Sequence, residues 1–502
     1  PLVNVSVNIP VPPVIKAQDI FGNFDKDFTF SPLTVVNTGG LGMLNVPTVP
    51  ANISNGILTF PSNFQFITEG TTTLVVTAEG LTTVPSDTII VGDPTLITDR
   101  FRSITSGNWA SNLTWQSSHD GITWRTPASI YPNNISLNVA TNTIQIQNTH
   151  TVTVDTIITA DQITVDAGAQ LVITPGDTLR VTNAPGAIPD IVVDGYLRNS
   201  GAFRQLSSSL QVNGSFEHNA DGGDLPTATW NTNSYAIITG IVNTTFMTSS
   251  SFVQSFYNLT WNCPNQLSDF VFYDNLRDSI GGGGWGIAVR GNFLVLSTNT
   301  GSIAFNNGGD GYTTSVLGNF DLQSGKVNLV TNNASAIGYI FSVAGNLNVK
   351  NGSFILSKQG NSIVTLNVGG NIDVSGGVLQ TTTLVNGVTA AINVTNDFIV
   401  ETEGIFDVSG YSSNASTGFS TINIGRDLLI STTNPTAGIR GFIPTAAESF
   451  TLNITRDFTI SGGAKFINAS AVYNTKNYLI KLGGNFNLSG AGSSFVFGNT
   501  GA

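Results

Sequence analysis

The chain has 502 residues, of which only 10% are charged and 40% are apolar, and its net charge at pH 7 is −12. That length exceeds one compact domain, so we expect at least two structural units or a repeat array. The acidic balance argues against nucleic acids and anionic membrane surfaces as partners, and the lack of a run of about 18 apolar residues argues against a membrane-spanning helix.

The first 93 residues alternate short apolar runs with Gly, Pro and Asn turns. The stretch Asn55–Phe60, a connection and the stretch Thr72–Ala78 form two strands at the spacing of a β-sandwich. This pattern resembles the immunoglobulin-like modules that are strung along bacterial surface proteins. We therefore predict an immunoglobulin-like β-sandwich over residues 1–93, ending near Gly92-Asp93-Pro94.

Residues 94–150 are rich in tryptophan and precede the regularly alternating strands that begin at residue 151. They contain Ser106-Gly107-Asn108-Trp109, a second tryptophan at Trp115, and the strand-like run from His150 to Val154. This order resembles a segment of secreted Bacteroidetes proteins that opens a β-helix, and many such proteins are cargo of the type IX secretion system. The resemblance implies an extracellular or bacterial cell-surface location, and secretion machinery as a partner. We interpret residues 94–150 as a transition that caps a solenoid.

From residue 151 to residue 502 the chain consists of short alternating strands, and its second half carries a repeat. In each repeat an Asn or Asp is followed by an apolar residue, any residue and another apolar residue. These positions recur about every 27 residues and are Asn292, Asn319, Asn346, Asn371, Asp397, Asp427, Asp457 and Asn485. A unit of about three strands without a helix pattern predicts a parallel β-helix, with coils stacked at roughly 4.8 Å.

The whole chain is thus predicted to be all-β, with an immunoglobulin-like sandwich followed by a long parallel β-solenoid. The apolar residue after each repeated Asn or Asp, from Phe320 to Phe486, is expected to point inward. The Asn/Asp column itself has two explanations. It is either a row of calcium ligands or a structural ladder that turns a corner and hydrogen-bonds from coil to coil, and we favour the ladder.

Residues 215–285 fit the repeat poorly, so we expect irregular coils with longer loops there. This region is rich in aromatic residues, which can form a recognition face when they are exposed. The candidates for ligand binding are Tyr257, Trp261 and Trp285.

A group of acidic residues near the start of this region is a candidate calcium site. Glu217, Asp221 and Asp224 bring together oxygen donors of the kind that calcium prefers. Their spacing matches neither an EF-hand nor a glycine-rich nonapeptide repeat, so a solvated acidic loop is the favoured alternative. We expect no cofactor other than calcium.

Four sites carry Asp, then Ser or Thr, then an aliphatic residue. This triplet resembles the O-glycosylation motif of secreted Bacteroidetes proteins, and the acceptors would be Thr88, Thr156, Thr178 and Ser279. Because the chain is rich in Thr and Ile, chance matches are the alternative.

No arrangement of catalytic side chains stands out in the sequence. The three histidines lack metal-site spacing, and Cys263, the single cysteine, has no neighbouring histidine and is interpreted as a small buried residue. No segment gathers acids and bases on adjacent coils, and only 19 Lys and Arg residues are available to build a groove for anionic sugars. We predict that the protein is not an enzyme. A polysaccharide lyase or glycoside hydrolase is the alternative.

Together these features predict an adhesin-like protein in which a stiff rod presents binding loops to a glycan or another cell-surface ligand. A passive stalk or exported structural component is the alternative. The final strand-like run, Phe495 to Gly498, lacks a polar cap, so we expect the chain to be part of a longer protein.

Overall fold

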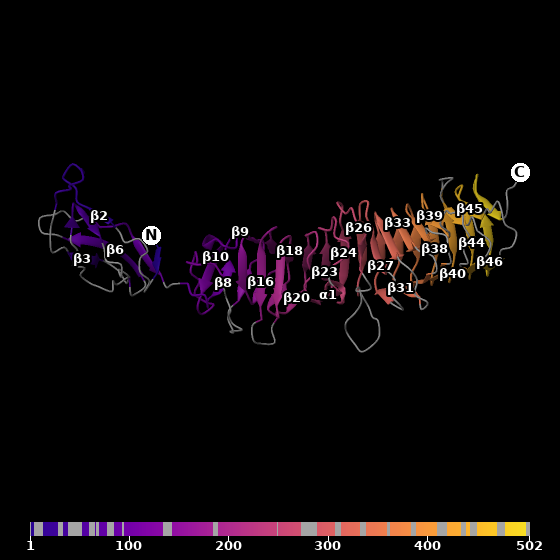
Figure 1. Ribbon diagram of the computed structural model, residues 1–502, viewed down its shortest axis with the longest axis horizontal. Coiled ribbons are helices and arrows are strands. Elements are labelled where there is room, and N and C mark those ends of the chain that lie inside the picture. Colours follow the sequence, from indigo (N-terminus) through magenta and orange to yellow (C-terminus); the bar gives the residue numbers. More distant parts are fainter. Residues whose placement is uncertain are drawn as a thin grey trace. The chain divides into compact units, whose positions relative to one another are not determined.

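The fold was obtained as a computed structural model, drawn in Figure 1. The chain forms two compact units, one of Pro1–Ile104 with Ala110–Asn133 and one of Thr105–Trp109 with Asn134–Ala502. Most of the tryptophan-rich segment therefore folds with the first unit. The structure describes residues 2–4, 14–28, 34–38, 53–59, 66, 70–77, 85–92, 95–133, 143–183, 189–247, 249–272, 289–306, 313–331, 338–358, 362–382, 388–408, 419–432, 438–441, 449–468 and 477–497.

The first unit contains two small sheets and a further strand pair. One sheet has the order β1-β7-β6-β3 with β1 and β7 parallel, the other is antiparallel with the order β2-β5-β4, and β8 pairs with β10 in the antiparallel sense. The elements are β1 (Leu2–Asn4), β2 (Val14–Lys16), β3 (Thr34–Thr38), β4 (Ile53–Ser54), β5 (Ile57–Thr59), β6 (Gly70–Thr77), β7 (Ile89–Gly92), β8 (Arg100–Ser103), the 3-10 helix Asn112–Thr114 and β10 (Trp115–Ser118).

The turn between β4 and β5 shows how the sequence forms this unit locally. Asn55 and Gly56 both have positive φ angles, 54° and 69°. Such a two-residue turn matches the twist of the strands that it joins, and Asn-Gly is the pair that adopts it most readily. The strand predicted from residue 55 is thus half of a hairpin. The immunoglobulin-like topology of this unit stays a prediction.

The second unit is a parallel β-solenoid, as the sequence predicts, and one sheet of fifteen strands runs along it. Because a coil returns to the same face after each turn, neighbouring strands in this sheet are parallel. In spatial order the strands are β9 (Gly107–Asn108), β12 (Thr151–Val154), β15 (Gln170–Ile173), β18 (Tyr196–Asn199), β21 (Ser215–His218), β23 (Tyr235–Ile238), β24 (Asn258–Asn262), β26 (Phe293–Ser297), β29 (Phe320–Leu322), β32 (Leu347–Val349), β35 (Ile372–Val374), β38 (Phe398–Glu401), β41 (Leu428–Ser431), β44 (Phe458–Ser461) and β47 (Phe486–Leu488).

The other faces of the solenoid change strands midway. The earlier coils use β11 (Ile144–Ile146), β14 (Ile163–Val165), β17 (Ile191–Val193), β20 (Leu210–Val212) and β22 (Thr229–Trp230) on one face, and β13 (Ile157–Ala160), β16 (Thr178–Thr182) and β19 (Ala202–Leu206) on another. The later coils use β25 (Phe270–Val271), β27 (Ile303–Asn306), β30 (Lys326–Val330), β33 (Ser353–Ser357), β36 (Val378–Thr382), β39 (Ile405–Asp407), β42 (Gly438–Gly441), β45 (Lys465–Asn468) and β48 (Ser494–Phe497). Their remaining face holds β28 (Thr313–Val316), β31 (Tyr339–Val343), β34 (Ile363–Val368), β37 (Thr389–Val394), β40 (Phe419–Ile424), β43 (Ser449–Ile454) and β46 (Asn477–Leu482).

Coil length distinguishes the two halves. Along the fifteen-stranded sheet, paired residues from β12 to β26 are separated by 19, 26, 19, 20, 23 and 34 residues. From β26 to β47 the separations settle to 27, 27, 25, 26, 30, 30 and 28. The short helix α1 (Ser249–Phe252) lies between β23 and β24. Among the described residues, no helix is long and apolar enough to cross a membrane.

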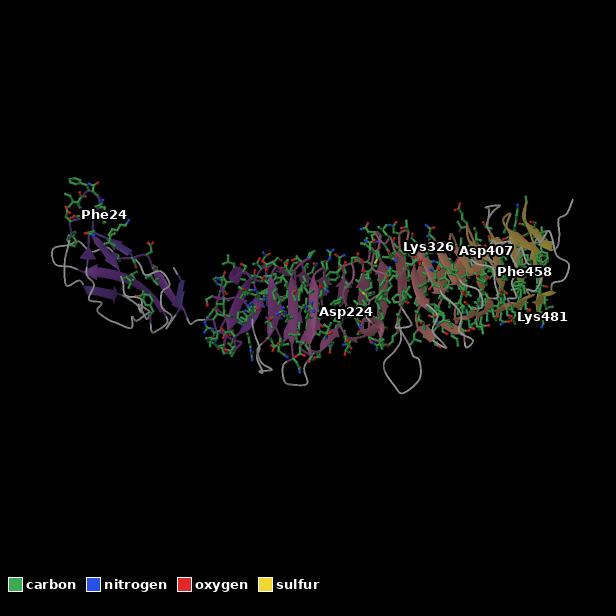
Figure 2. All side chains as sticks on the ribbon, in the orientation of Figure 1. Phe24, Asp224, Lys326, Asp407, Phe458 and Lys481 are labelled. Carbon is green, nitrogen blue, oxygen red and sulfur yellow. The ribbon has the colours of Figure 1, made fainter. Side chains whose placement is uncertain are left out.

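The core of the solenoid is a stack of apolar side chains, one layer for each coil. Strands alternate buried and less buried residues, as β34 and β37 show. The predicted inward column is fully or almost fully buried at Phe320, Leu347, Ile372, Phe398, Leu428 and Phe458 (Figure 2 labels Phe458). Phe486 differs, with 44% of its surface exposed, because no later described coil covers it.

Candidate functional site

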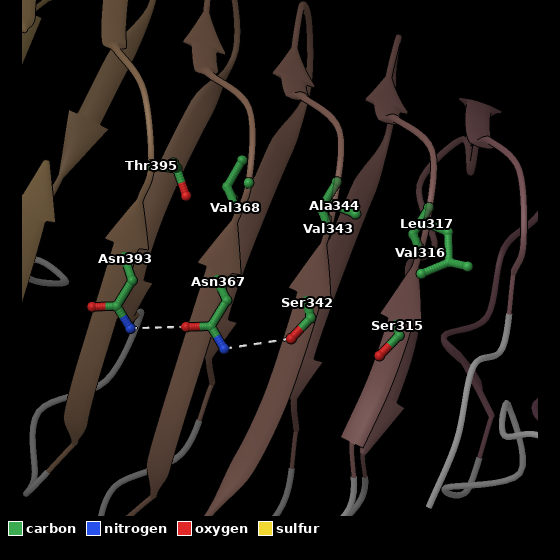
Figure 3. A pocket seen from close by; sticks show the side chains of 11 residues that line it. Ser315, Val316, Leu317, Ser342, Val343, Ala344, Asn367, Val368, Asn393 and Thr395 are labelled. Carbon is green, nitrogen blue, oxygen red and sulfur yellow. Dashed lines mark hydrogen bonds between the residues drawn. The ribbon is translucent and has the colours of Figure 1, made fainter. Parts of the chain in front are cut away.

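An open groove of about 350 Å³ crosses four adjacent coils of the solenoid (Figure 3). It lies along the ends of β28, β31, β34 and β37 and the turns that follow them. It is lined by Ser315, Val316, Leu317, Ser342, Val343, Ala344, Asn367, Val368, Gly369, Asn393 and Thr395, none of which is charged.

The alternation of the strands explains which side chains face the groove. In each strand the residue before the polar lining residue is buried, for example Thr314, Phe341 and Leu366. The next residue turns outward, and the register places Ser315, Ser342, Asn367 and Asn393 beside one another. The structure thus forms a straight row of hydroxyl and amide groups, which we call the amide row.

Hydrogen bonds join the amide row from coil to coil. Asn393 donates from Nδ2 to Oδ1 of Asn367 at 2.8 Å, and Asn367 donates to the Ser342 hydroxyl at 3.4 Å (Figure 3). The row continues beyond the groove through Asn423 and Asn453, with amide bonds of 2.8 and 2.7 Å. Each Asn in the groove thereby uses one N–H and one oxygen lone pair. A second N–H and a second lone pair remain for a ligand.

Sequence reasoning missed this row, although a signal was present. A polar residue stands four positions before each repeated Asn or Asp from residue 319 onward. These residues are Ser315, Ser342, Asn367, Asn393, Asn423, Asn453 and Lys481. A fixed offset from a repeat marks a fixed position on the coil, so the row could have been predicted.

One wall of the groove is aliphatic. Leu317 exposes 46% of its surface at the turn after β28, and Ala344 is exposed at the same place in the next coil, whereas Val316, Val343 and Val368 are at most 2% exposed and belong to the core beneath. The groove therefore pairs a row of neutral hydrogen-bonding groups with an aliphatic wall. That combination suits an uncharged ligand that carries both hydroxyl groups and C–H surfaces.

The predicted recognition aromatics lie elsewhere, and the prediction for Trp261 is wrong. Trp261 is completely buried, donates from Nε1 to Oε1 of Gln266 at 2.9 Å, and packs on Phe270 with ring centroids 4.8 Å apart. Other large rings of this region, Phe252 and Phe272, are likewise buried and pack on one another. Tyr257 is half-buried, with the guanidinium of Arg290 5.8 Å from its ring centre. Trp285 lies outside the described residues.

The buried carboxylate of Glu217 is engaged by its own neighbours. It accepts hydrogen bonds from the Tyr196 hydroxyl and from Thr239 Oγ1, the latter at 2.6 Å, and its Oε2 lies 3.6 Å from Nε of Arg198. Burial first, and then Glu217, raise the pKa of Tyr196 well above its ordinary value. These contacts leave Glu217 as part of a polar network on the long sheet.

Asp221 fixes the next coil rather than joining Glu217. Its carboxylate accepts the backbone N–H groups of Val242, Asn243 and Thr244 at 2.9 to 3.1 Å. Partial burial raises the pKa of Asp221, but these backbone donors outweigh it and hold the pKa below its ordinary value. Asp224 is exposed, with Oδ1 3.5 Å from the Ser251 hydroxyl (Figure 2). In the described part of the chain, no three His, Cys, Asp or Glu side chains are arranged to hold a metal ion.

The repeated Asn/Asp column forms a hydrogen-bonded corner ladder. In every step the Oδ1 atom of one residue accepts the backbone N–H of the next, at 2.7 to 3.2 Å. The ladder starts one coil earlier than the sequence repeat. Its members are Asn258, Asn292, Asn319, Asn346, Asn371, Asp397, Asp427, Asp457 and Asn485.

Two of the three acidic members of the ladder, Asp397 and Asp427, are paired with arginines. Nε of Arg426 lies 3.5 Å from Oδ1 of Asp397, and Nε of Arg456 lies 3.4 Å from Oδ1 of Asp427. Because the ladder needs only one side-chain oxygen, Asn and Asp serve equally well where the extra charge is balanced. This geometry uses one oxygen of each carboxylate to bind the backbone of the next coil, as the ladder interpretation predicts.

A second polar row lies on the long sheet, at Asp321, Asn348 and Asp373. Asn348 donates from Nδ2 to Oδ1 of Asp321 at 2.5 Å. The Oδ1 atom of Asp373 is buried without a hydrogen-bond partner. Burial, followed by repulsion from Glu401, raises the pKa of Asp373 above its ordinary value, with Lys350 acting in the opposite direction.

The predicted modification sites differ in accessibility. Thr88 is exposed, Thr156 and Thr178 are half-buried, and Ser279 lies outside the described residues. Cys263 is buried, and burial raises the pKa of its thiol to about 12. A thiol that is this hard to ionise is a poor nucleophile at neutral pH.

Comparisons with protein-family models, curated protein sequences and solved structures found no match to this chain. The fold therefore defines its class, a parallel β-solenoid protein preceded by a smaller β unit. No family is shown, and the candidate site must be judged on its geometry.

Proposed function

We propose that this chain is a glycan-binding, adhesin-like rod of a bacterial cell surface. The observation that carries the proposal is the uncharged groove across β28, β31, β34 and β37, with its row of amide and hydroxyl groups beside an aliphatic wall. Sugars present hydroxyl groups on their edges and C–H groups on their faces, so both surfaces of the groove have a counterpart. The hydrogen bonds of the amide row hold the polar groups of the groove in place, which limits the entropy lost on binding.

The proposed cell-surface location is supported by a sequence resemblance and by the type of fold. The Ser106-Gly107-Asn108-Trp109 segment resembles secreted Bacteroidetes proteins, which supports export, with the secretion machinery as a transient partner. An immunoglobulin-like first unit fits the same setting. A solenoid in which each coil rests on its neighbour is suited to holding a binding face away from a membrane.

We further propose that the protein binds without cleaving. Hydrolysis of a glycosidic bond commonly requires two carboxyl groups that flank it. The groove lining contains none. Calcium is not needed in this scheme, because Glu217 and Asp221 are already engaged by protein donors.

A glycan array probed with the purified chain, with and without a calcium chelator, tests the proposal. Binding that survives the chelator, with no shortening of the bound glycan, supports it. Cleavage products would instead identify an enzyme. Loss of binding with chelator would restore calcium as a ligand. Absence of binding to every glycan would favour the passive stalk.

A further inference from the structure

We infer that the groove holds a neutral, extended polysaccharide whose chain runs along the solenoid axis, across the strands rather than along them. The inference rests on the proposed glycan binding and specifies its ligand, its direction and its residues. Three properties of the groove carry it: the repeat of its polar groups, its lack of charge and its aliphatic wall.

The repeat sets the direction. Ser315, Ser342, Asn367 and Asn393 stand on successive coils, so their polar groups recur along the axis at about 4.8 Å, the spacing of neighbouring strands. An extended chain of β-linked sugars presents hydroxyl groups at every ring, at an interval close to this spacing. An extended peptide repeats its same-face side chains at roughly 6.6 Å, so successive side chains would not stay aligned with the polar groups of the groove. The row therefore favours a polysaccharide over a peptide.

The absence of charge sets the class of sugar. None of the eleven lining residues is charged. A uronate carboxylate or a sulfate placed here would lose water and gain no cationic partner, which is unfavourable. Neutral hexoses and N-acetylhexosamines carry hydroxyl, amide, ether and C–H groups and no charge. The free N–H and lone pair that Asn367 and Asn393 retain can pair with those hydroxyl groups.

The aliphatic wall completes the site. Leu317 and Ala344, both exposed, form an aliphatic surface beside the amide row. Sugar rings rest their C–H faces on such surfaces while their edges hydrogen-bond. Four coils contribute to the groove, so a bound stretch of about four rings would fill it at one ring for each strand spacing.

Calorimetric titration with oligosaccharides of two to six rings tests the inference, using neutral β-linked hexose and N-acetylhexosamine series and an oligogalacturonate series of equal lengths. For a neutral series, affinity should rise with length and level off near four rings. The oligogalacturonates should bind at least tenfold more weakly. Affinity that is independent of length would overturn the axial placement, and tighter binding of oligogalacturonate would overturn the neutral class.

Two pairs of variants locate the site. Asn367→Ala should weaken binding roughly two- to tenfold, the range for one lost neutral hydrogen bond, whereas Asn453→Ala removes an amide of the same row outside the groove and should not. Leu317→Glu should abolish binding. Its control is Leu296→Glu, which alters a leucine of similar exposure, 38% against 46%, in a different sheet. Both leucines are exposed, so folding is not expected to fail.

The outcomes separate this inference from the proposed function. If the wild-type chain binds no glycan, both the proposed function and this inference are refuted. If it binds a glycan and both Asn367→Ala and Leu317→Glu bind as tightly as wild type, the glycan lies elsewhere. The inference then fails and the proposed function stands.

Discussion

Asn346 lies in the middle of the corner ladder, where its side chain has a single structural task. Its Oδ1 atom accepts the backbone N–H of Asn371 at 2.9 Å, and its own N–H donates to Asn319 at 2.9 Å. Asn346→Ala removes the acceptor and leaves the N–H of Asn371 without a protein partner. The site is tight, since a Cβ placed on Gly370 would lie 2.1 Å from that Oδ1. The expected loss is about 1–3 kcal/mol, the cost of one unsatisfied polar group.

Asn346→Asp is the matched control. It keeps Oδ1 and the shape of the side chain, and the neighbouring ladder residues, Asn319 and Asn371, are uncharged. No like-charge repulsion therefore arises between coils. We expect a change in the free energy of unfolding within about 0.5 kcal/mol of zero, as for an ordinary surface substitution.

Hydrogen exchange is the suitable assay, because a coil contacts only its neighbours and the loss is local. In Asn346→Ala, the amide of Asn371 should exchange about 5- to 150-fold faster, which corresponds to 1–3 kcal/mol. Amides of the first unit should not change. Equal exchange in Asn346→Ala and wild type would refute the role of Oδ1. Equally fast exchange in both variants would show that the amide nitrogen matters instead.

Other predictions concern single buried groups. Because the pKa of Asp373 is raised in the folded protein, its ionisation destabilises the fold at neutral pH, and Asp373→Asn should increase the free energy of unfolding at pH 7. This gain should vanish as the pH falls below about 4, where the carboxyl is protonated in the unfolded chain as well. Denaturant titrations at both pH values check this, and an equal gain at low pH would contradict it. Trp261→Ala should lose about 3–5 kcal/mol of stability, measured by denaturation, whereas unchanged stability would show that the ring is not packed. Cys263 should resist iodoacetamide at pH 8 in the native protein and react after denaturation, and native labelling would show that it is accessible.

The later coils could be predicted from sequence because side-chain stacking repeats residue types. The backbone N–H at each corner requires a side-chain oxygen at the corner before it, so Asn or Asp recurs once per coil, with a period of 25 to 30 residues. Among the residues that the structure describes, the coils before β24 show no such ladder, and their lengths range from 19 to 26 residues. Their strands were predicted from alternation alone. Their register could not be, since no residue type recurs at a fixed interval.

The aromatic residues show where sequence reasoning failed. Trp261 was predicted to face a ligand because it lies in a region without a regular repeat. The alternation of β24 places it in phase with the buried Leu259, and the structure buries both. Strand alternation was thus a better guide than the absence of a repeat. The amide row does follow a repeat, since each of its residues stands four positions before a residue of the corner ladder. It was not predicted because only the Asn/Asp repeat of the ladder was used.

Stacking also explains why so few residues are charged. Two like charges one strand spacing apart, about 4.8 Å, repel by roughly 0.9 kcal/mol in water and roughly 3.5 kcal/mol at an effective dielectric constant of 20. Asp397 and Asp427 stand one above the other in the corner ladder, and each has an arginine within 3.5 Å. Amides need no such partner, because each donates to the one before it, as Asn393 does to Asn367 at 2.8 Å. A long stack therefore selects neutral polar side chains, which accounts for a charged fraction of 10%. The neutrality of the groove, on which the proposed preference for an uncharged glycan rests, follows from the same rule that lets the coils stack.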